Sequence, residues 1–307
     1  MFSITSRMPV CAYTLLLLLV GALSVAASPV ATAQPLSAVS LVNTIYTSRW
    51  NPASPDPSGI TYWPARKALV VVDGEVEEMP NLFKGVNVWQ SSLTGTVGAT
   101  YSTLAFTKEP VGIDIAVNTQ NNNFFISDDS KKTIHEVALG PDGKLGTGDD
   151  IRRSFLTSSF GNNDPEGLTL GAGKLYTVDG AGRKLYISEP GANGRFDGAG
   201  DDKVTRIDLV PVGIQDPEGI DFNPDSGTLY IADRAGKTVW EITTAGKLVR
   251  KIALKPIIPT VLNPGDVTLA PNSRNAAVKS LYVVDRGVDN NDDPNENDGK
   301  IYEITLN

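Results

Sequence analysis

Cysteine is nearly absent from this 307-residue chain. Its only cysteine, Cys11, lies in an N-terminal segment that we expect to be removed. The remaining chain then has no disulfide, no thiol nucleophile and no cysteine-bound zinc. Histidine is equally scarce. His135 is the only one, which argues against a histidine-rich metal centre and against a Ser-His-Asp triad. No G-x-S-x-G motif is present either, so the sequence assigns no catalytic residue.

Residues 1–33 have the pattern of a secretory signal peptide. Arg7 precedes an apolar run over residues 12–27, and a small-residue cleavage motif follows at residues 31–33, with a second candidate at residues 25–27. The run is short for a membrane span, which needs about 20 residues. We therefore expect a secreted or periplasmic protein with no stable membrane span and one domain over residues 34–307. An uncleaved N-terminal anchor is the alternative.

Basic residues are fewer than acidic ones, 27 against 35, and loss of Arg7 with the signal peptide would leave a net charge of −9. This acidity argues against nucleic acid or an anionic membrane surface as a partner. It suits cations or cationic ligands. We expect a monomer that binds a small molecule or a protein.

What the sequence does contain is a repeated unit, whose opening prolines are 47 to 55 residues apart. Each opening joins a polar residue and a proline to a short apolar strand. The five openings are Asp56–Ile60, Glu109–Ile113, Asp164–Leu168, Asp216–Ile220 and Asn263–Val267. A second apolar run in each unit ends on aspartate, at Asp73, Asp128, Asp179, Asp233 and Asp285. A third run carries a ring at one fixed place, at Trp89, His135, Tyr186, Trp240 and Tyr302.

Several short strands in a unit of this length predict an all-β fold, a five-bladed β-propeller with four-stranded antiparallel blades. The last unit ends at Leu306 without a fourth strand, whereas residues 39–47 form a spare strand at the N-terminus. We expect this N-terminal strand to complete the last blade, which removes an open sheet edge. Six blades are the alternative if residues 76–107 hide a degenerate unit.

Most repeated positions have structural explanations. The opening glycines lie where neighbouring blades crowd the axis, so a side chain has little room. The aspartates that end the second strands are expected to accept hydrogen bonds from the turns that follow. His135 occupies a position that holds an aromatic ring in every other unit, so we interpret it as a packing residue.

These openings and second strands resemble NHL-type propellers and, for five units, exported bacterial propellers that contain the SdiA-regulated domain. The resemblance covers about residues 39–306 and implies the propeller fold; such propellers include binding proteins, lactonases and phosphoesterases. In the lactonase-like members an acidic residue of an E-G motif holds calcium in the central tunnel. The matching residues here are Glu166 and Glu218. The other three units depart from the motif, with Ser58, Val111 and Gly265.

The strand openings should also surround the mouth of the tunnel with acidic groups. The residues before the prolines are Asp56, Glu109, Asp164, Asp216 and Asn263, and beside them lie Glu166, Glu218 and Asp266. Calcium takes several oxygen ligands, so this ring is a candidate calcium site. The alternative is that most of these carboxylates accept hydrogen bonds from backbone N–H groups.

Two glycine- and aspartate-rich insertions, residues 140–150 and 191–202, are further candidates for calcium through Asp149 and Asp201. Neither has the EF-hand spacing, and polar hairpins with Asp-Gly turns are the alternative. A third acidic loop, residues 289–298, reads as a solvated loop.

Two functions are compatible with these features. One is a secreted propeller that binds a ligand or protein partner and is stabilised by calcium. The other is a calcium-dependent hydrolase for a lactone, ester or phosphoester at the acidic mouth. No basic group that would hold a phosphate is evident near the motifs, which counts against phosphoesterase activity.

Overall fold

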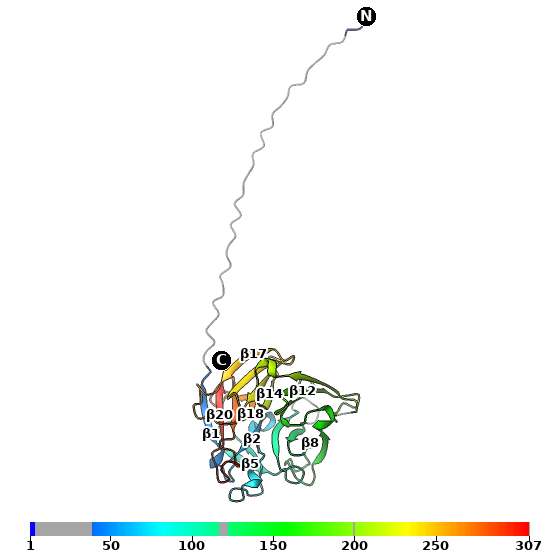
Figure 1. The fold of residues 1–307 in the computed structure, drawn as a ribbon. Helices are drawn as coiled ribbons and strands as arrows, with labels where there is room; N and C mark the ends of the chain where they lie inside the picture. Colours follow the sequence, from blue (N-terminus) through cyan, green and yellow to red (C-terminus); the bar gives the residue numbers. More distant parts are fainter. Residues whose placement is uncertain (4–38, 117–121, 199, 307) are drawn as a thin grey trace. The chain divides into compact units, whose positions relative to one another are not determined.

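The computed structural model describes residues 1–3, 39–116, 122–198 and 200–306, so the predicted signal peptide lies outside the described residues apart from its first three. The described chain folds into five sheets of four antiparallel strands (Figure 1). The inner strands contact one another in a closed cycle, from β2 through β6, β10, β14 and β18 back to β2. The prediction of a five-bladed β-propeller is confirmed.

The strands follow the repeats closely. Blade 1 contains β2 (Pro57–Trp63), β3 (Ala68–Asp73), β4 (Val88–Ser91) and β5 (Val97–Tyr101). Blade 2 contains β6 (Pro110–Ile115), β7 (Phe124–Asp128), β8 (Thr133–Ala138) and β9 (Ile151–Leu156). Blade 3 contains β10 (Pro165–Gly171), β11 (Lys174–Asp179), β12 (Lys184–Glu189) and β13 (Lys203–Asp208). Blade 4 contains β14 (Pro217–Asn223), β15 (Thr228–Asp233), β16 (Thr238–Thr243) and β17 (Leu248–Ala253). Blade 5 contains β18 (Pro264–Pro271), β19 (Lys279–Asp285), β20 (Lys300–Thr305) and β1 (Leu41–Tyr46).

Blade 5 is closed by the N-terminal strand, as predicted. β1 lies antiparallel beside β20, with Ile45 opposite Ile301 (Figure 1). Residues 76–107 hold a short 3-10 helix, η3 (Val76–Glu78), and strands β4 and β5 of blade 1. They form no additional blade, so the six-bladed alternative is not realised.

Regular helix is scarce among the described residues. Apart from η3 there are four other short 3-10 helices in this part of the chain, namely η1 (Thr47–Arg49), η2 (Pro64–Arg66), η4 (Thr157–Phe160) and η5 (Val210–Val212). None of the helices formed by these residues has the length and apolar character needed to traverse a bilayer.

The core is divided into five apolar clusters, each of which joins two successive blades. Between blades 1 and 2, for example, Trp63 meets Phe124 edge to face with 5.0 Å between the ring centroids. The β-branched and aromatic residues of the second and third strands supply most of this surface. Burial of apolar area between blades therefore holds the ring together.

The axis is crowded because all five inner strands converge there. A Cβ on Gly112 would lie 2.8 Å from the Cα of Gly167, and one on Gly167 would lie 2.6 Å from the Cα of Gly219. Real Cβ atoms do not approach so closely, so the opening motif requires glycine here. This confirms the packing role predicted for these glycines. Each inner strand has a register shift beside this layer, which turns the next side chains toward the axis.

The aspartates that end the second strands are buried and bind backbone, as predicted. Asp233 accepts hydrogen bonds from Gly236 N (3.1 Å) in the following turn and from Asp216 N (3.0 Å) before the inner strand. The same bond to the following turn is made by Asp73, Asp128, Asp179 and Asp285. These carboxylates therefore fix the positions of the loops that surround one end of the axis.

We expect the closing strand to stabilise the whole ring. Ile45 is 4% exposed between blades 5 and 1, whereas Leu41 on the same strand is 42% exposed. Ile45→Ala should lower the free energy of unfolding by about 2–5 kcal/mol, and Leu41→Ala by less than about 0.5 kcal/mol. Urea unfolding followed by circular dichroism measures both. Deleting residues 34–50 should lower the melting temperature of the single transition, and an unchanged melting temperature would contradict the closure.

Candidate functional site

The mouth, defined here as the axis end where the inner strands begin, is surrounded by three residues from each blade. They are the residue before the opening proline, the residue after it, and the residue after the second-strand aspartate. The last of these positions holds Gly74, Asp129, Gly180, Arg234 and Arg286. Because these residues differ from blade to blade, the mouth is chemically asymmetric although the fold is nearly symmetric.

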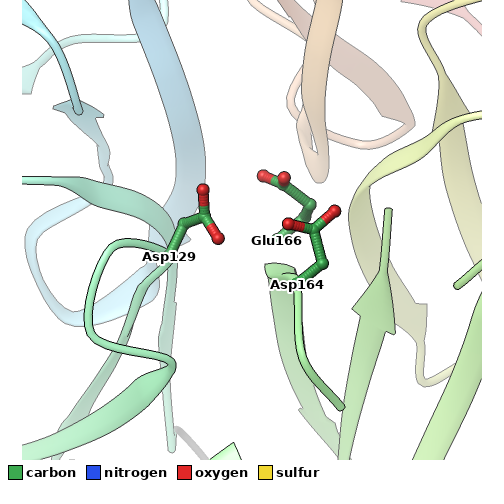
Figure 2. A group of neighbouring side chains, drawn as sticks. All are labelled: Asp129, Asp164 and Glu166. Atoms are coloured by element: carbon green, nitrogen blue, oxygen red, sulfur yellow. The ribbon is translucent and has the colours of Figure 1, made fainter. Parts of the chain in front are cut away.

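On the side of blades 2 and 3, three carboxylates converge (Figure 2). Asp129, Asp164 and Glu166 each place a carboxylate oxygen within 4.8 Å of the other two. Asp164 accepts a hydrogen bond from Ala181 N at 2.7 Å. No donor among the described residues contacts the Glu166 carboxylate. This cluster, called the carboxylate cluster below, is partly buried. No lysine or arginine among the described residues forms an ion pair with it, and Arg286 lowers the pKa of Glu166 only through its more distant charge.

The charges in the carboxylate cluster are held close enough to perturb one another. Burial, together with the neighbouring Asp164 and Glu109, raises the pKa of Asp129 to about 6. Burial and the nearby Glu218 raise the pKa of Glu166 well above its usual value. Removing water and adding like charge both disfavour the ionised carboxylate, so these groups retain protons that a free carboxylate would release.

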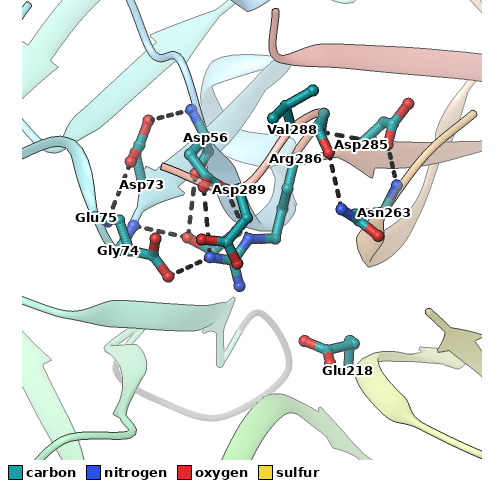
Figure 3. A network of polar contacts seen from close by, with 12 residues as sticks. Asp56, Asp73, Gly74, Glu75, Glu218, Asn263, Asp285, Arg286, Val288 and Asp289 are labelled. Atoms are coloured by element: carbon teal, nitrogen blue, oxygen red, sulfur yellow. Dashed lines mark hydrogen bonds and ion pairs between the residues drawn. The ribbon is translucent and has the colours of Figure 1, made fainter. Parts of the chain in front are cut away.

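On the side of blades 5 and 1, an arginine compensates the carboxylates (Figure 3). Arg286 donates to the fully buried Asp56 at 2.6 Å and also pairs with Glu75. Burial nevertheless raises the pKa of Asp56 to about 6, against the lowering effect of Arg286. Glu75 has a second, buried carboxylate oxygen with no hydrogen-bond partner among the described residues.

Blade 4 supplies a second arginine. The Nε of Arg234 lies 2.8 Å from a carboxylate oxygen of Asp216 and 3.0 Å from one of Glu218. Burial raises the pKa of Glu218 to about 7, while Arg234 acts in the opposite direction. Two arginines therefore lie near the opening motifs, where the sequence interpretation found no basic group that would hold a phosphate. Both arginines directly follow a second-strand aspartate, so comparing that position across the five repeats would have found them.

Asp266 does not join the mouth carboxylates, contrary to the sequence interpretation. It occupies the position that is glycine in the other four blades, and its carboxylate accepts hydrogen bonds from Ile60 N (2.9 Å) and Val267 N (2.8 Å). It is 1% exposed. The side chain therefore fills the axis and ties blade 5 to blade 1.

In the two insertions, aspartates mainly hold the loop backbone. Asp149 accepts hydrogen bonds from the hydroxyl of Thr147 (2.6 Å) and the N–H of Asp142. Asp201 accepts two from Asn193. In the second insertion the carboxylates of Asp197, Asp201 and Asp202 also lie within 4.8 Å of one another. The hairpin alternative thus explains the hydrogen bonds of these aspartates. In the second insertion, three carboxylates also lie close enough together to bind a metal ion.

The third acidic loop is only partly solvated. Its middle, residues 291–295, is exposed, but Asn290 and Glu296 are 6% and 5% exposed. Each has a buried side-chain oxygen without a hydrogen-bond partner among the described residues. Burial raises the pKa of Glu296 to about 9, with a further contribution from Asp56. Glu296 therefore retains its proton at neutral pH.

His135 lies in the ring position of blade 2, 8% exposed, with its imidazole 5.0 Å from the Phe106 ring. Its Nε2 is 3.7 Å from a carboxylate oxygen of Asp128. In blade 4, Trp240 donates its indole N–H to the equivalent Asp233 at 3.0 Å. His135 thus occupies the same structural place as Trp240, which supports its interpretation as a packing residue.

Comparisons with known proteins agree with the fold. The model resembles glutaminyl cyclase from Myxococcus xanthus (15% identity, 88% of this chain and 96% of that one, TM-score 0.52). It also resembles the PQQ-bound aldose sugar dehydrogenase of Streptomyces coelicolor (13% identity, 87% and 97%, TM-score 0.51). At such identities the likeness shows a propeller fold and nothing about activity. No protein-family model and no curated protein matches the sequence.

The mouth should make stability depend on pH. Asp129, Glu166 and Glu218 have pKa values above those of the unfolded chain, near 4. Their stabilising contribution is complete below the unfolded pKa and is lost as pH rises through the folded pKa. In a chelator, the melting temperature should therefore fall between pH 5 and pH 8.

Differential scanning fluorimetry at unit pH steps measures this trend. The variant Asp164→Asn with Glu166→Gln should show a weaker decline, because it has fewer interacting carboxylates. A melting temperature that rises steadily to pH 8 would rule out this role of the mouth.

Proposed function

We propose that the chain is an exported β-propeller that binds calcium in the carboxylate cluster and a small molecule or protein on the surrounding face. The observation that carries the proposal is Glu166, whose carboxylate faces Asp129 and Asp164 with no donor from the described residues. Like charges at this spacing need compensation by protons or by a cation. The signal-peptide pattern of residues 1–33 supports an activity outside the cytoplasm.

Calcium fits the cluster better than magnesium does. Calcium accepts six to eight oxygen ligands in irregular geometry, and carboxylates, carbonyls and waters can all contribute. Magnesium demands near-octahedral geometry and gives up its waters reluctantly. Three carboxylates from two blades supply only part of a coordination shell, which leaves positions for water or for a ligand. The ion would thus serve both blade packing and ligand binding.

The mouth cluster is a better candidate than the insertions. In the second insertion, Asp201 and Asp202 already accept hydrogen bonds from Asn193, Gly191 and Gly198. The Glu166 carboxylate has no such bonds. A cation therefore replaces fewer existing interactions at the mouth.

A calcium-dependent hydrolase remains the second candidate, because one specific arrangement favours it. Glu218, with a pKa of about 7, lies next to Arg234 in the blade adjoining the carboxylate cluster. A carboxylate of this pKa can accept a proton near neutral pH, and arginine can orient a negatively charged substrate. Calcium bound nearby would polarise an ester, lactone or phosphoester. The asymmetry of the mouth supplies the unlike groups that such a reaction needs.

We expect calcium to raise the melting temperature of the purified protein. A cation that binds only the folded state adds about 2.7 kcal/mol at a hundredfold excess over Kd. The variant Asp164→Asn with Glu166→Gln should lose most of this response. The matched control is Glu218→Gln, which changes the equivalent residue of blade 4 and should keep the response, since Arg234 already compensates Glu218.

A second pair of variants separates the sites. If the response survives in the mouth variant and disappears in Asp149→Asn with Asp201→Asn, the insertions hold the ion. Identical melting curves in chelator and in millimolar calcium would reject calcium binding altogether. Magnesium should give a clearly smaller shift than calcium.

The hydrolase alternative has its own expected outcome. If it holds, the protein turns over members of a lactone, ester and phosphoester panel in calcium, and Glu218→Gln lowers kcat by at least about a hundredfold. Turnover that is equal in calcium and in chelator, or unaffected by Glu218→Gln, would remove this candidate. The same variant should leave the calcium-induced melting shift intact.

A further inference from the structure

A second site lies at the opposite end of the axis from the mouth. There the described residues line a cavity of about 470 Å³. One large apolar side chain comes from each blade, always five residues after the opening proline. These side chains are Tyr62, Ile115, Leu170, Phe222 and Leu269. This volume is typical of small-molecule sites, and a wall of this kind favours an apolar ligand.

The floor of the cavity is a ring of hydroxyls and carboxylates that alternate from blade to blade. Thr61, Asp114, Asp221 and Thr268 line the cavity, and the hydroxyl of Thr169 lies between the two carboxylates, so that each inner strand contributes one residue. The Asp114 carboxylate is fully engaged by four donors, namely the hydroxyls of Thr61 and Thr169 and the N–H groups of Ile115 and Leu170. Asp114 therefore serves mainly to join the blades.

Asp221 accepts fewer short hydrogen bonds than Asp114 does. One of its carboxylate oxygens accepts a hydrogen bond from Leu269 N at 2.6 Å and lies 3.4 Å from the hydroxyl of Thr268. The other oxygen lies 3.4 Å from the hydroxyl of Thr169, and the carboxylate also interacts with the N–H of Phe222, which donates to that hydroxyl at 3.2 Å. That hydroxyl has only one hydrogen, and it lies closer to Asp114, at 3.1 Å. The second oxygen of Asp221 is thus held by long and shared contacts, and the carboxylate is partly exposed at the bottom of the cavity.

No lysine or arginine in the part of the chain that the structure describes pairs with the Asp221 carboxylate. The two lysines that line the cavity, Lys174 and Lys279, are paired with Glu189 (2.9 Å) and Asp225 (2.6 Å). Both pairs are partly exposed. The cavity therefore has apolar walls, a rim whose charges are paired, and a floor whose carboxylates have no cationic partner.

We propose that this cavity binds an organic ammonium ion, with its apolar body against Leu170, Phe222 and Leu269 and its charged nitrogen against Asp221. An ammonium group supplies a further hydrogen-bond donor and the missing positive charge. The aromatic rings of Tyr62 and Phe222 add favourable contact with a cation. Burial and the neighbouring Asp114 raise the pKa of Asp221 to about 8, which a bound cation would reverse.

The inference does not depend on calcium at the mouth. The inner strands separate the two ends by the glycine layer and by the ring of Thr61, Asp114, Thr169, Asp221 and Thr268. Ligand binding at the floor should therefore be the same in chelator and in calcium. It should also survive Asp164→Asn with Glu166→Gln, so that the two proposals succeed or fail separately.

Isothermal titration calorimetry with three probes of one shape tests the proposal. The probes are 4-phenylbutylamine, 4-phenylbutan-1-ol and 4-phenylbutyrate, which differ in the charge of one end. The amine should bind at least about tenfold more tightly than the alcohol, and the acid should not bind. Equal affinity for amine and alcohol, or no binding of the amine, would overturn the proposal.

Two matched variants locate the charge. Asp221→Asn keeps an oxygen that accepts the N–H of Leu269 and should weaken amine binding at least about tenfold without changing alcohol binding. Asp225→Asn removes the same charge at the rim and should leave amine affinity within about twofold. Equal weakening by both variants would indicate only a long-range field and reject the assignment to Asp221.

If Asp221→Asn does not fold, Leu170→Trp tests whether the amine binds in this cavity. A larger ring at that position should fill the cavity and abolish amine binding while leaving both floor carboxylates in place. Circular dichroism and the melting temperature confirm that each variant is folded. Amine binding that persists in a folded Leu170→Trp protein would place the ligand elsewhere and contradict the proposal.

Discussion

The close approach of the five inner strands at the axis is the constraint on which the rest of the structure depends. Between Gly112, Gly167 and Gly219 there is no room for a Cβ. Blade packing can be this tight only because the repeat has a glycine at that position, and because a register shift turns the residues on either side. Asp266 is the exception, and its carboxylate fills the remaining space while binding the N–H of Ile60 in the next blade.

Because the axis is narrow, polar side chains on either side of the glycine layer lie close together, and both groups contain carboxylates. The repulsion between these carboxylates is offset by different groups at different positions. Arg286 and Arg234 compensate carboxylates at one side of the mouth, hydroxyls and backbone N–H groups engage Asp114 at the floor of the cavity, and retained protons offset the rest. Glu166 and Asp221 are the two carboxylates beside which we propose an external cation.

The fold was predictable because it depends on features that recur. Five openings, five second strands that end in aspartate and one unpaired N-terminal strand predict the blade count and the closure, and β1 beside β20 bears this out. The site was predicted less well, since it depends on how the blades differ. Repeat position alone brought Glu166 and Asp164 together, but it misplaced Asp266 and overlooked Asp129, Arg234 and Arg286. Those three follow the second-strand aspartate, and only the turn geometry shows that they reach the mouth.

The cavity at the far end escaped sequence analysis for a related reason. Tyr62, Leu170 and Phe222 read as ordinary strand residues, and alternation predicts that they are buried in a blade. The twist of inner strands toward the axis instead leaves them partly exposed around a common space. The same twist brings Asp114 and Asp221, from non-adjacent blades, near enough to share the hydroxyl of Thr169. One hydroxyl hydrogen cannot serve two carboxylates, so the near-symmetry of the ring itself produces the unequal site at Asp221.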